Sequence, residues 1–182
     1  MRDQQILKAK VEIHTQYDQY IEVHKYYAGT IVWVAILALA LEALLPVYFR
    51  SAAILELPLL VTIYFGLSWR NPSSGLLLGM AIGLAQDSLG HTPFGMYGIA
   101  KTAVGFVASS FGSRIDVEHP ISRFLLTFAF FHVHNAVLVV TNRLLLGQHE
   151  PYLEANLIIA SVVNSAVAVF LYALLDKLRK PS

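Results

Sequence analysis

The chain has 182 residues, of which 56% are hydrophobic and only 14% are charged, and its mean hydropathy is +0.57. Soluble domains carry about a quarter charged residues, so this composition indicates a membrane protein. The net charge of +1 gives no indication of nucleic-acid binding. The absence of cysteine excludes disulfides, iron–sulfur clusters and thiol catalysis, and a zinc site would need His and carboxylate ligands only.

Residues 1–27 are polar and precede the first apolar run. Because that run is long, we do not expect a cleavable signal peptide. Lys8, Lys10 and Lys25 lie among isoleucines, valines and tyrosines. This pattern predicts a short N-terminal amphipathic segment on the cytoplasmic membrane face or on a partner, and a partly ordered basic tail is an equal alternative.

Six apolar segments follow, joined by short loops. They cover residues 28–49, 52–69, 72–89, 94–111, 120–146 and 152–175. Each is near the length of one bilayer crossing, and the fifth is long enough to tilt. Pro58 predicts that the second helix begins there, after a short interfacial stretch. We therefore expect an all-α polytopic membrane protein with six transmembrane helices in one domain, residues 28–176, and a basic tail, residues 177–182.

The lysines and arginines near the segment ends are unevenly distributed between the two sides of the membrane. One side would hold Arg2, Lys8, Lys10, Lys25, Arg70, Arg114, Arg123, Lys177, Arg179 and Lys180. The other side would hold only Arg50 and Arg143. Cytoplasmic loops carry the excess of positive charge, so both termini are predicted to be cytoplasmic.

The third segment carries Gly75, Gly79, Gly83 and Asp87 at a strict spacing of four residues. On a helix, this spacing places all four on one side. Glycines on one flank of an apolar helix form a groove in which a neighbouring helix backbone packs closely. We expect a packing or partner-binding face there; the alternative is that glycines are simply common in membrane helices.

Four ionisable residues fall in the predicted outer half of the bilayer: Glu42, Glu56, Asp87 and Lys101. Charges at this depth are costly and often functional, so the four form a candidate polar cluster. Segments three and four make a hairpin, so Asp87 is expected to pair with Lys101 or to accept from backbone donors and cap the hairpin. A contact with a ligand or partner is the alternative for Asp87.

The fifth segment carries His132 and His134 near its middle. Residues two apart on a helix diverge by about 200°, so these histidines do not readily share a metal. A polar contact with a neighbouring helix is expected instead, with Asn164 as a partner. Phe128-x-x-x-His132 resembles one motif of the intramembrane CAAX-type proteases, but their paired glutamates are missing because Glu42 stands alone.

Other catalytic signatures are also missing from the sequence. No Gly-rich phosphate loop follows a strand, and no serine lies in a nucleophile elbow. We therefore expect no enzymatic activity, no cofactor and no metal.

Two consecutive motifs resemble those of the rod shape-determining protein MreD family. They are Pro58-Leu-Leu-Val-Thr-Ile-Tyr64-Phe-Gly-Leu and Gly75-x3-Gly79-x3-Gly83-Leu-x-x-Asp87-Ser-x-Gly90-x-x-Pro93-x-Gly95. That family has a Pro-led apolar helix, a Gly-rich helix ending in Gly-Leu-x-x-Asp, and a tight turn bearing Pro-x-Gly. The resemblance covers roughly residues 55–110 and adds Pro93 and Gly95 to the predicted partner or packing face.

The resemblance implies a multi-pass, non-enzymatic protein of the bacterial inner membrane that controls rod shape and side-wall peptidoglycan synthesis. Its implied role is a scaffold for MreC and, through it, for MreB filaments, RodA and a class B penicillin-binding protein. The family is similar in fold to the substrate-binding subunits of energy-coupling-factor vitamin transporters, so the alternative is a solute-binding membrane subunit. The outer charged cluster suits that alternative, whereas the short outer loops leave no evident lid.

Overall fold

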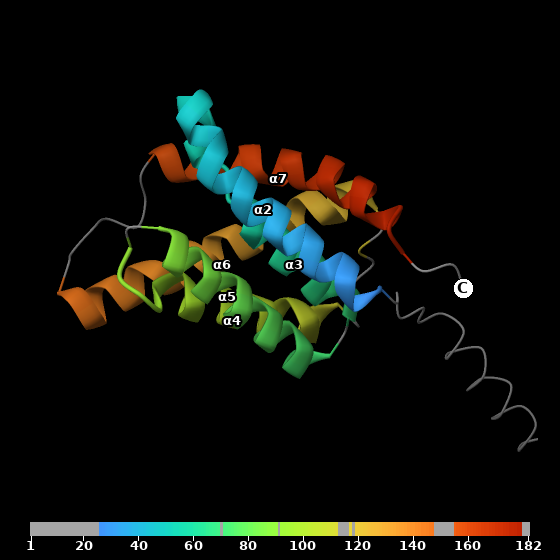
Figure 1. The fold of residues 1–182 in the computed structure, drawn as a ribbon, viewed down its shortest axis with the longest axis horizontal. Helices are drawn as coiled ribbons and strands as arrows, with labels where there is room; N and C mark the ends of the chain where they lie inside the picture. Colours follow the sequence, from blue (N-terminus) through green and yellow to red (C-terminus); the bar gives the residue numbers. More distant parts are fainter. Residues whose placement is uncertain are drawn as a thin grey trace, which may run out of the picture.

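The computed structural model describes residues 26–69, 71–90, 92–112, 117, 119–147 and 155–179, and this part of the chain is all-helical (Figure 1). Its elements are α2 (Ala28–Tyr48), the short 3-10 helix η1 (Arg50–Ile54), α3 (Leu57–Trp69), α4 (Pro72–Leu89), α5 (Met96–Phe111), α6 (Pro120–Leu146) and α7 (Ala155–Asp176). The predicted amphipathic segment lies outside the described residues except for Tyr26 and Tyr27, as do residues 180–182 of the predicted basic tail.

Three helices are long and apolar enough to cross a membrane: Ala28–Tyr48, Pro120–Leu145 and Asn156–Asp176. Large apolar side chains on them point outward, and Trp33, Leu144 and Phe170 are each more than 70% exposed. Such surfaces are costly in water and suit a lipid environment, so the fold is that of a membrane protein. The other α-helices are shorter or less apolar, and the total of six crossings stays a prediction.

Helix α3 is the centre of the bundle. Every residue from Leu57 to Ser68 is buried, and the helix packs against α2, α4, α5, α6 and α7. Thr62 and Ser68 donate to carbonyl oxygens of their own helix, at 2.8 and 2.7 Å, so burial leaves neither hydroxyl unpaired. A helix that is apolar on all sides is stable only when its neighbours surround it.

The predicted second segment is divided into two elements. Residues 50–54 form η1, and α3 begins at Leu57, which confirms the predicted helix start at Pro58 to within one residue. At 1.5 Å per residue, the 13 residues of α3 span about 20 Å, less than the roughly 30 Å of a bilayer core. The non-helical link before α3, Leu55 and Glu56, is partly buried, so its backbone polar groups need partners inside the protein.

Asn164 of α7 supplies those partners. Its side chain accepts from the backbone N–H of Glu56 at 2.9 Å and donates to the carbonyl of Ile54 at 2.7 Å. Asn164 is fully buried and lies about 14 Å along α7 from the first residue of that helix. A single amide side chain thus holds the start of α3 in place.

At one end of the bundle, which we call the terminal end, a polar network joins the first described residues to the last. The Tyr26 and Tyr64 hydroxyls are 2.7 Å apart, and Tyr64 donates to Asp176 at 2.8 Å. Asp176 also accepts from Arg123 at 2.6 Å and from Arg179 at 2.7 Å. Burial alone would lower the pKa of Arg179, but hydrogen bonds with Tyr64 and Tyr26 and the Asp176 charge raise it above its ordinary value. The opposite end, where α4 turns into α5, is the hairpin end.

Candidate functional site

The glycine face of α4 contacts α5. A Cβ added to Gly75, Gly79 or Gly83 would collide with the α5 backbone, at the carbonyl oxygens of Gly105, Lys101 and Tyr97 respectively. The missing side chains let the two backbones touch. The face is therefore a packing contact within the chain, and a partner helix cannot dock in this groove because α5 already fills it.

Asp87 caps the N-terminus of α5. Its carboxylate accepts hydrogen bonds from the backbone N–H groups of Gly95, Tyr97 and Gly98, each at 3.0 Å. Gly95 has φ of +100°, a conformation that glycine adopts without strain. Negative charge is stabilised at a helix N-terminus, where unpaired N–H groups converge. Two kinds of partner were predicted for Asp87. The structure shows the backbone donors, and the predicted pairing with Lys101 is wrong.

Pro93 belongs to the same turn. Its carbonyl oxygen accepts from the backbone N–H of Met96 at 3.3 Å, and this hydrogen bond closes a tight turn just before α5. The turn brings the backbone N–H of Gly95 within hydrogen-bond distance of the Asp87 carboxylate.

Lys101 pairs with Glu56 instead. The Lys101 side chain is fully buried, and its Nζ lies 3.2 Å from Glu56 Oε2 and 4.6 Å from the centroid of the Tyr97 ring. The ion pair joins α5 to the residue before α3, and the aromatic ring adds a cation–π contact. A buried lysine needs such partners because an unpaired charge in low dielectric is costly.

Glu42 of α2 contacts α4 through Gln86, whose amide Nε2 donates to Glu42 Oε1 at 2.7 Å. The second oxygen of each side chain, Glu42 Oε2 and Gln86 Oε1, is buried without a hydrogen-bond partner among the described residues. Gln86 is only 9% exposed. Buried acceptors are normally satisfied, so an unpaired oxygen on each member of this hydrogen-bonded pair requires an explanation.

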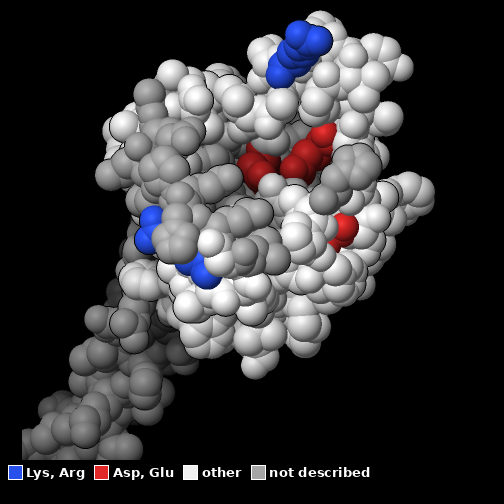
Figure 2. Space-filling view, turned by 90° about the vertical axis from the view of Figure 1, so that its left-hand side faces the viewer, with Lys and Arg blue, Asp and Glu red and all other residues white. Residues whose placement is uncertain are grey.

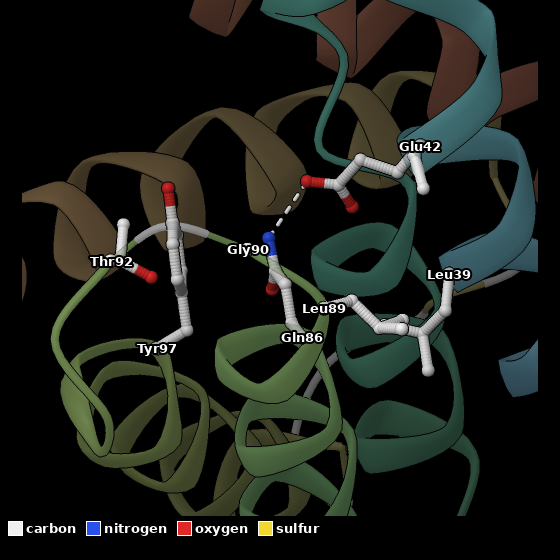
Figure 3. A pocket seen from close by; sticks show the side chains of 8 residues that line it. Leu39, Glu42, Gln86, Leu89, Gly90, Thr92 and Tyr97 are labelled. Carbon is white, nitrogen blue, oxygen red and sulfur yellow. Dashed lines mark hydrogen bonds between the residues drawn. The ribbon is translucent and has the colours of Figure 1, made fainter.

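These side chains line a cavity of about 210 Å³ at the hairpin end, between α2, α4 and the turn that precedes α5 (Figure 3). Its lining residues are Leu39, Glu42, Ala43, Gln86, Leu89, Gly90, Thr92 and Tyr97. Figure 3 shows Glu42 and Leu39 on one side, Thr92 and Tyr97 on the other, and Gln86 between them. Figure 2, which views this end of the bundle, shows acidic side chains inside a hollow.

The four residues of the predicted polar cluster thus play different roles. Glu56 and Lys101 form a pair, Asp87 is a helix cap, and Glu42 alone reaches the cavity. Sequence reasoning missed Gln86 and Tyr97 as lining residues. An amide in the apolar run beside Asp87 was the available signal for Gln86, since adjacent helix residues point about 100° apart and so reach different neighbours.

The histidines of α6 do not bond to Asn164, whose amide is engaged by the link before α3 and by Ala160. His132 Nδ1 lies 2.9 Å from the Phe128 carbonyl of its own helix. His134 is buried and stacks on Tyr97 of α5, with ring centroids 5.9 Å apart. Neither ring nitrogen of His134 has a hydrogen-bond partner in the described part of the chain, so the predicted hydrogen bond to Asn164 is wrong.

The side chains of the cavity can bind a small ligand. Within the described residues, no group of three or more His, Cys, Asp or Glu side chains could hold a metal ion. The cavity offers unpaired acceptors and an apolar wall, which suit a ligand with hydrogen-bond donors. Comparisons with protein-family models, with curated proteins and with solved structures find no match.

Proposed function

We propose that this chain is a non-enzymatic scaffold in the inner membrane of a bacterium, acting like MreD in the machinery that elongates rod-shaped cells. One observation carries the proposal. The second of the two motifs that carry the resemblance, Gly75 to Gly95, forms a single structural unit, a hairpin in which three glycines contact α5 and Asp87 caps it. The sequence motif thus corresponds to a rigid pair of helices, as a scaffold requires.

The proposal includes six membrane crossings with both termini in the cytoplasm. In that orientation the terminal-end network lies at the cytoplasmic surface, and the cavity opens toward the outer surface. Arg123 and Arg179 of that network then follow the positive-inside rule. The buried, short α3 crosses inside a ring of other helices, so its length need not match the bilayer.

The proposed partner is MreC, which would link this chain to MreB filaments, RodA and a class B penicillin-binding protein. Because α5 occupies the glycine groove, the membrane helix of MreC would contact outward-facing side chains instead. Co-purification in detergent tests this directly. The tagged full chain should retain MreC and shift it to a larger complex, and separate elution of the two would count against the proposal.

A cellular test is independent of detergent. Depleting the gene in its own rod-shaped host should turn rods into spheres, and expression of the wild-type gene should restore the rods. Normal rods after a clean deletion would contradict the scaffold role.

The cavity favours a second candidate, a solute-binding subunit of an energy-coupling-factor type transporter. Its hydrogen-bonding side chains and its position at the proposed outer surface suit a small ligand. Impaired uptake of one vitamin after deletion, with rod shape intact, would establish this candidate in place of the scaffold.

A further inference from the structure

We infer that the hairpin-end cavity binds a ligand carrying a primary ammonium group, with Glu42 Oε2 and Gln86 Oε1 as its acceptors. This inference does not depend on the proposed function, since either a scaffold or a transport subunit can hold such a ligand. It rests on charge balance, on unpaired acceptors and on the shape of the cavity.

The first step is the balance of charge. Three acids, Glu42, Glu56 and Asp87, and one amine, Lys101, gather here. Lys101 is paired with Glu56 at 3.2 Å, and the Asp87 carboxylate accepts from three backbone N–H groups. Glu42 is therefore the acid left with neither a cation nor a set of backbone donors. An isolated carboxylate is costly in a low-dielectric setting, and a bound cation removes that cost.

The second step is the state of the acceptors. Glu42 Oε1 already accepts from Gln86, but Glu42 Oε2 and Gln86 Oε1 accept from no donor among the described residues. Both residues line the cavity, and Gln86 is nine-tenths buried. An ammonium group carries three N–H donors and no acceptor, so it complements one carboxylate oxygen and one amide oxygen. A hydrogen bond between charged partners is also stronger than a neutral one.

The third step is the choice between an ammonium and a metal ion. The described residues contain no cluster of three or more metal-ligating side chains, whereas hard cations take six or more oxygen ligands. An ammonium group needs only two or three acceptors. The available oxygens therefore match an amine better than a divalent metal.

The fourth step is size and shape. At about 210 Å³, the cavity is smaller than the roughly 300 Å³ at which pockets for drug-sized ligands begin. It fits a small amine or a lipid headgroup. Leu39, Ala43 and Leu89 give it an apolar side, and Leu89 is 63% exposed. A ligand with an apolar extension can thus lie partly outside the cavity.

The test uses the purified full chain after exchange into lipid-free detergent. It is given equal amounts of dioleoylphosphatidylethanolamine and dioleoylphosphatidylcholine, and bound lipid is counted by native mass spectrometry. The choline headgroup keeps the positive charge but has no N–H donor, so it isolates the proposed hydrogen bonds. We expect retention of the ethanolamine lipid to exceed that of the choline lipid by about tenfold.

Variants locate the effect. Glu42→Gln keeps the size and the carbonyl acceptor for Gln86 but removes the charge and replaces the proposed acceptor Oε2 with an NH2 donor, and it should abolish the preference. Gln86→Met removes the amide oxygen and should also weaken it, which provides a second variant if one of them fails to fold. Gly29→Ala is the matched control, because an added Cβ there meets nothing within 4 Å, and it should keep the preference.

A parallel arm separates the two sources of the amine. Millimolar ethanolamine that raises the melting temperature of the wild type, with no effect on Glu42→Gln, identifies a free amine. The ethanolamine lipid acting alone identifies a headgroup. Equal retention of both lipids together with no effect of ethanolamine overturns the inference, as does equal stabilisation by potassium ions. MreC capture is a separate measurement, so failure here leaves the proposed function standing.

Discussion

Helix α4 packs against α5 and against α2 by different means. Toward α5 it presents Gly75, Gly79 and Gly83, which leave the backbones in contact. Toward α2 it presents Gln86, whose amide donates to Glu42 beside the cavity that both residues line. The side of α4 that faces α5 is closed, because glycines leave no side chains between the two backbones. The side that faces α2 is open, because the long polar side chains of Glu42 and Gln86 line a cavity there.

The difference shows how one helix can serve both folding and binding. Backbone contact leaves no space for a ligand and fixes the position of α5, including Tyr97, which lines the cavity. Side-chain contact leaves space and unpaired acceptors. The close α4–α5 contact therefore holds in place the residues of both helices that line the cavity, as a preorganised binding site requires.

The largest effect is expected from a methyl group on the closed side. In Gly79→Ala, the new Cβ collides with the carbonyl of Lys101, and neither backbone can yield without separating the helices. Overpacking of a well-packed contact costs about 1–3 kcal/mol or more, and here the contact is with backbone, so we expect a loss of at least about 3 kcal/mol. Size-exclusion chromatography and the thermal midpoint in detergent measure it.

Gly29→Ala is the control, because the same substitution in α2 meets open space and alanine favours a helix. It should leave the thermal midpoint unchanged or slightly higher. Equal stability of the two variants would show that the α4–α5 contact is looser than described.

The next effect concerns the charge pair beside the cavity. Glu56→Gln leaves Lys101 buried without its carboxylate, and breaking a buried pair costs about 3 kcal/mol. The double variant Glu56→Gln with Lys101→Met removes both charges and should recover part of that loss. The free energies of unfolding, combined in a double-mutant cycle, should give a coupling above about 1 kcal/mol. A coupling near zero would mean that the two residues act independently.

A smaller loss is expected for Asp87→Ala. Three N–H groups at the start of α5 lose their acceptor. Loss of a helix cap lowers the free energy of unfolding by up to about 2 kcal/mol, and we expect a value near this upper limit. The free energy of unfolding in mixed micelles measures this loss. Because Lys101 is not the partner, exchanging the two charges (Asp87→Lys with Lys101→Asp) should not restore stability. Recovery by that exchange would contradict the assigned cap.

Local patterns predicted the helices well. The bounds of α4 and α6 agree with the apolar runs, because Pro72 and Pro120 begin these helices and Gly90 and Gly147 end them. The glycine spacing also predicted a close contact on one side of α4. Helix ends and glycine spacing depend on residues that are close together in the chain, so they can be read from the sequence alone.

The partners of the polar residues were harder to predict, because they depend on how helices distant in the sequence are placed. Lys101 and Glu56 are 45 residues apart, and Asn164 contacts the link before α3 from 108 residues away. The nearest opposite charge along the hairpin suggested Asp87 for Lys101. In the structure, backbone N–H groups at the start of α5 bind the Asp87 carboxylate in place of Lys101, because Gly95 in the left-handed conformation directs them toward it.

The smallest effect on stability is expected on the open side. Glu42→Gln keeps a carbonyl oxygen for the Gln86 amide and replaces Oε2, which has no partner among the described residues, with an uncharged amide NH2. We therefore expect the free energy of unfolding in lipid-free detergent to change by no more than about 0.5 kcal/mol. Titration with denaturant in mixed micelles measures it, with Glu56→Gln as the destabilised reference. A large loss would place Glu42 in the structural framework, as Glu56 is, and would remove the distinction between the two sides of α4. A small change, combined with a lost preference for the ethanolamine headgroup, would mean that the open side serves binding while the closed side maintains the fold.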